Sequence, residues 1–70
     1  MNMVPVESSN LKTVGYDKVA KTLAVEFHHG GVYEYYDVPA PVYERLLAAE
    51  SKGKYFYAYI KGVYAYEKIR

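Results

Sequence analysis

Residues 22–38 read TLAVEFHHGGVYEYYDV, and this stretch decides the fold. Its first six residues alternate large apolar side chains with smaller or polar ones, which predicts a half-buried strand. The paired Gly30 and Gly31 predict a turn, because glycine adopts positive φ angles at little cost. The last seven residues alternate again and place Tyr33 and Tyr35 on one face, so we expect an antiparallel hairpin.

The flanking residues extend this hairpin into a meander. Residues 11–17 predict a third strand, and residues 3–6 predict a short edge segment limited by Pro5. After the hairpin, residues 64–69 alternate once more and are interpreted as a last strand or a frayed tail.

Two short helices are predicted between the hairpin and the tail. Pro41 fits the first turn of a helix, and apolar residues then repeat at helical spacing until residues 51–53 break it. A second helix is predicted over residues 54–61, with an apolar stripe formed by Phe56, Ile60 and Val63. The predicted fold class is α+β, one domain over residues 1–70, with a three-stranded antiparallel meander followed by two short helices.

Ten of the seventy residues are tyrosine, whereas the chain has two phenylalanines and neither tryptophan nor cysteine. A phenol ring suits surfaces that are partly apolar and partly wet, which favours binding over catalysis. The adjacent His28 and His29 point to opposite faces of a strand and cannot easily share one metal ion. No arrangement of nucleophile and base stands out either, so we expect no enzyme, no metal site and no cofactor.

Charge is unevenly distributed along the chain. The net charge is +1, but residues 1–50 sum to −3 and residues 51–70 sum to +4. The basic part is interleaved with tyrosines, a composition typical of surfaces that contact phosphates and stack on bases. An amphipathic helix with solvated lysines is the alternative interpretation. Because the chain shows neither a signal peptide nor an apolar run long enough to cross a membrane, we expect a cytoplasmic protein without membrane contact.

The candidate phosphate-binding residues lie around the start of the second predicted helix, except for Lys61 at its end. The unpaired N–H groups at the helix start favour anions, and glycine permits close approach. This set consists of Ser51, Lys52, Gly53, Lys54 and Lys61. The candidate stacking residues are Tyr33, Tyr35, Tyr55, Tyr57 and Tyr59.

Each of these assignments has a structural alternative. Residues 51–54 also suit a plain helix–helix connection, and Tyr33 and Tyr35 also suit a core beneath the helices. Ser8 and Ser9 either hold a phosphate or cap a turn.

The chain resembles the KTSC domain family over about residues 4–64. The resemblance rests on VESS at 6–9, VGYD at 14–17, LAVEF at 23–27, GVYEY at 31–35, DVP at 37–39 and AESKGKYF at 49–56. The family marker Tyr-x-Tyr is Tyr33 and Tyr35 here, whereas Tyr57 stands where family members often carry Asn. The resemblance implies a domain that is found alone or at the C-terminus of some lysyl-tRNA synthetases, with RNA binding as its suggested role.

The leading hypothesis is therefore a non-catalytic module that binds nucleic acid, most readily RNA. The alternative is a homo-oligomer that binds a nucleotide-like or other anionic ligand between subunits, since a small chain without cysteines gains stability from association. A third hypothesis is a protein-interaction module that uses the same tyrosines.

Overall fold

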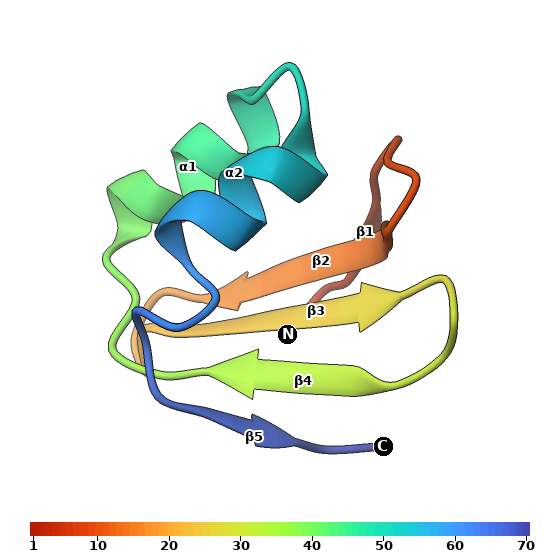
Figure 1. The fold of residues 1–70 in the computed structure, drawn as a ribbon. Helices are drawn as coiled ribbons and strands as arrows, with labels where there is room; N and C mark the ends of the chain where they lie inside the picture. The colour runs from red at the N-terminus through yellow and green to blue at the C-terminus, as the bar shows by residue number, and fades with distance from the viewer.

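The computed structural model describes residues 1–70 and shows one antiparallel sheet with two helices across one of its faces (Figure 1). The strand order follows the chain: β1 (Val4–Pro5), β2 (Leu11–Asp17), β3 (Thr22–Phe27), β4 (Val32–Tyr35) and β5 (Tyr66–Lys68). The helices α1 (Ala40–Ala48) and α2 (Lys52–Tyr59) connect β4 to β5. The α+β class and the hairpin are confirmed. The predicted three-stranded meander is longer by β1, where a short edge segment was predicted, and by β5, where the alternatives were a last strand and a frayed tail.

Several boundaries differ from the prediction, since β4 ends at Tyr35 instead of residue 38 and α2 ends at Tyr59 instead of residue 61. Residues 66–68 form a strand because they pair with β4, where Tyr66 lies opposite Tyr35. The helix α2 begins two residues earlier than predicted, since Ser51 caps it and Gly53 lies inside its first turn. Val63 is 61% exposed beyond the end of α2, so its assignment to the apolar stripe was wrong.

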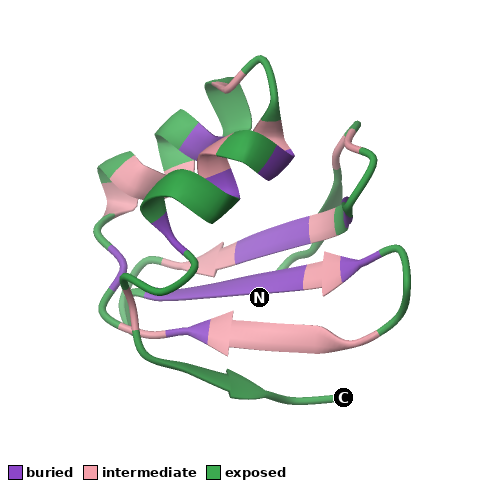
Figure 2. Cartoon of the chain, viewed as in Figure 1, coloured by how far each residue is buried: buried purple, intermediate pink, exposed green.

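The core lies between the two helices and the face of the sheet that they cover, called here the front face. In Figure 2 the buried residues lie on the central strands, at the end of β4 and on both helices. Both helices contribute to it, and ten large apolar side chains form one cluster: Leu11, Val14, Leu23, Val25, Phe27, Tyr35, Val38, Leu46, Phe56 and Ile60. Burial of each such side chain contributes about 1.5–3 kcal/mol, which is how so small a chain holds together without disulfides.

The opposite face of the sheet, called the back face, is covered in part by the N-terminal residues. Gly15 lies at a position of β2 that faces this side of the sheet, and it is buried. The methionines that lie near it, Met1 and Met3, remain 55% and 38% exposed. A Cβ atom on Gly15 would lie 2.7 Å from Met3 Sδ and 2.8 Å from the backbone oxygen of Asn2. The missing side chain therefore makes room for residues 1–3.

We predict that Gly15→Ala lowers the free energy of unfolding by about 1–3 kcal/mol, because a backbone oxygen must move to accept the methyl group. The same substitution in a chain lacking residues 1–3 is expected to be neutral or to stabilise by about 0.4–1 kcal/mol, since alanine restricts the unfolded chain. Urea unfolding followed by circular dichroism measures both. Equal destabilisation in the two chains would show that the N-terminal residues do not pack on Gly15.

Candidate functional site

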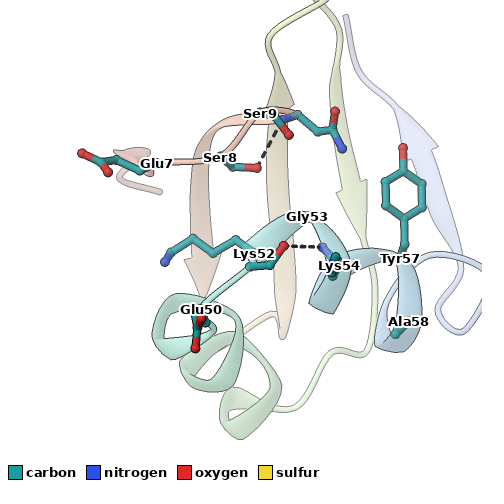
Figure 3. Close-up of a pocket in the computed structure, with 11 residues that line it drawn as sticks. Glu7, Ser8, Ser9, Glu50, Lys52, Gly53, Lys54, Tyr57 and Ala58 are labelled. Atoms are coloured by element: carbon teal, nitrogen blue, oxygen red, sulfur yellow. Dashed lines mark hydrogen bonds between the residues drawn. The ribbon is translucent and has the colours of Figure 1, made fainter.

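The loop after β1 and the start of α2 form a polar pocket of about 640 Å³ (Figure 3). It brings together two segments that the sequence analysis treated separately, Ser8-Ser9 and residues 51–54. Its lining consists of Glu7, Ser8, Ser9, Asn10, Glu50, Ser51, Lys52, Gly53, Lys54, Tyr57 and Ala58. We call it the polar pocket.

Two of the three serines that line this pocket hold the backbone in place. The Ser8 Oγ atom accepts hydrogen bonds from the backbone N–H groups of Asn10 and Leu11, both at 3.2 Å. The Ser51 Oγ atom accepts one from the N–H of Lys54 at 3.3 Å and so caps α2. Both serines therefore cap backbone N–H groups in the structure. Because each Oγ atom acts only as an acceptor in these bonds, its O–H group can still donate a hydrogen bond to a ligand.

Gly53 allows the start of α2 to lie against the loop. A Cβ atom on Gly53 would approach the Asn10 Nδ2 atom to 3.3 Å and the Ser8 Oγ atom to 3.6 Å. Any larger side chain would push the helix away from the loop or fill the pocket. The first N–H groups of α2 have no partner within the helix, so its positive end belongs to the same pocket.

The charged residues of the polar pocket are of both signs. The Lys52 ammonium donates a hydrogen bond of 3.1 Å to the backbone oxygen of Ala49, which ties it to the end of α1. Lys54 is exposed, and Glu7 and Glu50 also line the pocket. Lys54 is therefore the lysine here whose ammonium is most readily available to a ligand.

A second pocket of about 450 Å³, the aromatic pocket, lies beside the first and shares Tyr57 with it. It opens between the last turn of α2 and the front face of β4 and β5. Its lining consists of Phe27, His29, Tyr33, Tyr35, Phe56, Tyr57, Lys61, Gly62 and Tyr66.

Five of these rings contact one another in a closed circuit. Phe27 lies 5.5 Å from Tyr33, and Tyr33 lies 5.9 Å from Tyr66, measured between ring centroids. From Tyr66 the circuit continues to Tyr35 at 5.6 Å and then to Phe56 at 5.3 Å. It closes where Phe56 meets Phe27 at 5.5 Å. The inner wall of the aromatic pocket is therefore a packed, preformed surface.

Exposed groups flank the mouth of the aromatic pocket. Tyr57 is 50% exposed and packs edge-on against Phe56, and Tyr66 is 60% exposed. The Lys61 ammonium lies 4.6 Å from the centroid of the Tyr57 ring. Such a contact at an exposed site contributes about 0.5–1 kcal/mol, less than the roughly 1–3 kcal/mol of a base stacked on an aromatic ring.

The predicted stacking residues fall into three groups. Tyr57 lines both pockets, whereas the rings of Tyr55 and Tyr59 pack against each other in a tilted arrangement at 4.8 Å and line neither pocket. Tyr33 and Tyr35 share the front face as predicted, and Tyr35, at 4% exposed, belongs to the core.

Several polar and aromatic pocket residues were not among the predicted site residues. Tyr66 and His29 line the aromatic pocket, and Asn10 lines the polar one. Only Tyr66 carried a signal in the sequence, the period-two alternation of residues 64–69.

No group of three or more His, Cys, Asp or Glu side chains is arranged to hold a metal ion. Neither helix has the length and apolar character required to cross a membrane.

A five-stranded antiparallel meander with two helices on one face defines a small α+β domain. The KTSC domain model matches residues 7–64, and the chain belongs to this family. A crystal structure of a KTSC domain protein from Yersinia pestis superimposes with a TM-score of 0.96 at 35% identity, over 99% of this chain and 97% of that one.

Two relatives show the contexts in which similar sequences occur. A lysine–tRNA ligase of Trichormus variabilis is 46% identical over 63 residues, which cover 90% of this chain and 11% of the ligase. A protein of Tsukamurella paurometabola is 46% identical over 59 residues, which cover 84% of this chain and 88% of that protein. The chain thus spans only 11% of the length of the ligase that it matches.

Two neighbouring tyrosines, Tyr35 on the front face and Tyr36 on the back face, have raised pKa values. Burial, followed by the neighbouring tyrosines, raises the pKa of Tyr35 to about 12. On the back face, partial burial and then the hydrogen bond to Glu67 raise the pKa of Tyr36 to about 12. The Tyr36 hydroxyl lies 3.0 Å from Glu67 and 3.3 Å from Glu34.

We predict that Tyr35 weakens the fold as it ionises. Its pKa in the folded chain lies above the ordinary value of about 10, so its stabilising contribution is complete below pH 10 and is lost as the pH rises toward 12. The melting temperature of Tyr35→Phe should therefore decline less steeply over this range than that of the unmodified chain. Tyr59→Phe, at a 60% exposed position, is the control and should decline like the unmodified chain. Equal slopes for all three would contradict the assignment.

Proposed function

We propose that this chain is a non-catalytic module that binds RNA through the surface formed by the polar and aromatic pockets. The observation that carries the proposal is the position of Tyr57 as a wall of both pockets. A nucleotide needs a partner for its phosphate and a flat partner for its base. The adjoining pockets offer both on one surface, and a cytoplasmic location is part of the proposal.

The distribution of charge over the two faces supports it. Lys61 lines the aromatic pocket, and Lys68 lies opposite Tyr33 on the front face of β5. The back face instead carries carboxylates, those of Glu26, Glu34 and Glu67. On the sheet itself, the lysines therefore lie on the side of the aromatic pocket and the carboxylates on the other side. The polar pocket carries both signs, with Glu7 and Glu50 beside Lys52 and Lys54, and the net charge of +1 provides little long-range attraction.

The relatives favour RNA over other polyanions. Several are named lysine–tRNA ligases, and the matching segment is a small part of each. A separate RNA-binding role for that segment is consistent with its occurrence as a protein of similar length in Tsukamurella paurometabola.

We predict that Lys54→Ala combined with Lys61→Ala weakens binding of a single-stranded RNA more than tenfold at about 0.1 M salt. Each lost phosphate contact should reduce the slope of log K against log salt by about 0.7, so the pair should reduce it by about 1.4. Fluorescence anisotropy with a labelled RNA at several salt concentrations measures both quantities. Lys52 is left unchanged, because its removal would also break the hydrogen bond to Ala49.

Lys18→Ala is the matched control. Lys18 is exposed and follows β2, whereas the polar pocket lies where β2 begins, seven residues and roughly 20 Å away. An equal effect of Lys18→Ala and the double substitution would mean that only overall charge matters. No binding above that of polyglutamate would reject RNA as the ligand.

A further inference from the structure

We infer that the aromatic pocket accepts one unpaired nucleobase, with the phosphate of the same nucleotide in the polar pocket on the other side of Tyr57. The inference rests on the proposed RNA binding and deepens it, because it names the part of the RNA that is recognised. The chemistry concerned is a purine or pyrimidine ring together with its phosphate, whether the nucleotide is free or part of a strand.

The first argument is the hydroxyl of Tyr35. This residue is only 4% exposed, and it lines the aromatic pocket. Within the chain, the tyrosine hydroxyls that donate hydrogen bonds are those of Tyr16 and Tyr36, so the Tyr35 hydroxyl donates to no protein group. No polar side-chain atom is completely buried without a partner, so this hydroxyl keeps some accessible surface, and the pocket that Tyr35 lines is where a ligand would meet it. It is a donor held ready for the edge of a ligand.

The second argument is the shape and lining of the pocket. Its volume of about 450 Å³ lies within the range of about 300–1,000 Å³ found for small-molecule sites. The closed circuit of rings forms its inner wall, and the half-exposed Tyr57 and Tyr66 offer ring surface at its mouth. The exposed ring surfaces of Tyr57 and Tyr66 suit a planar ring. A base inside a duplex cannot reach them, because its faces are covered by its neighbours.

The third argument is the row of groups along α2. Gly53, Tyr57 and Lys61 are spaced four residues apart and therefore lie in line along one side of the helix and its final turn. The row joins the open start of α2, a stacking ring and an ammonium group. A base that stacks on Tyr57 displaces the Lys61 ammonium from the ring and leaves it free to pair with a phosphate.

The test compares two labelled 12-mers of equal charge by fluorescence anisotropy. One is a single-stranded RNA, and the other is a strand of tetrahydrofuran abasic units that keeps the phosphates and lacks the bases. We expect the intact chain to bind the RNA at least tenfold more tightly than the abasic strand. Tyr57→Ala should reduce the preference to about one, because the stacking partner is lost. Tyr35→Phe keeps the ring and should weaken RNA binding about fivefold, with abasic binding unchanged.

Tyr59→Ala is the matched control, because Tyr59 is an exposed tyrosine on the same helix that lines neither pocket. It should leave the preference for bases intact. Circular dichroism confirms that each variant is folded. Competition with adenosine and uridine monophosphates then separates the two sources of the base. If either monophosphate displaces the labelled RNA at the concentration at which unlabelled RNA does so, the result would support the nucleobase pocket and identify the free nucleotide as its ligand.

Three results would overturn the inference. Equal binding of the RNA and the abasic strand would show that the aromatic pocket does not bind a base, but it would leave the proposed RNA binding intact. Tighter binding of a duplex of the same sequence than of the single strand would do the same. Failure of both strands and both mononucleotides to bind more tightly than polyglutamate would reject the proposed function together with the inference.

Discussion

Packing of the Phe56 ring against the sheet is the contact on which the rest of the structure depends. Phe56 is 1% exposed and contacts Phe27 of β3 and Tyr35 of β4. The short helix α2 buries few other side chains, so this ring determines how the helix lies on the sheet. Each residue of a helix is rotated about 100° from the last, so with Phe56 facing inward Tyr57 must lie on a flank. That flank is the boundary between the two pockets.

Much of the fold could be predicted because its strands obey a simple period. Alternation placed Tyr33 and Tyr35 on one face, and the glycine pair located the hairpin turn, where Gly30 and Gly31 have φ angles of 97° and 88°. The fifth strand was harder to recognise, since all three of its residues are exposed and the alternation of residues 64–69 also fitted a frayed tail. A strand of that kind is specified by its hydrogen bonds to β4, which a local pattern does not reveal.

The candidate site was predicted only in parts. Residue types and helix signals drew attention to residues 51–54 and to Ser8, but no local pattern indicates that the two segments meet. Their meeting depends on the missing side chain of Gly53 and on the turn that Ser8 stabilises. Likewise, helical spacing predicts that Tyr57 and Tyr59 lie on different sides of the helix, but it does not predict which of them lies beside the aromatic circuit. Tertiary packing decides that.

The strand β5 has two roles, and the same three residues serve both. It supplies Tyr66 to the aromatic pocket, and it also covers the edge of β4, whose free N–H and C=O groups would otherwise invite pairing with another chain. As the new edge, β5 is short and carries the charged Glu67 and Lys68, both features that discourage such pairing. The same three residues therefore affect both solubility and ligand contact. A substitution in β5 that improves ligand contact can be tolerated only if the strand still discourages edge pairing, and the reverse also holds.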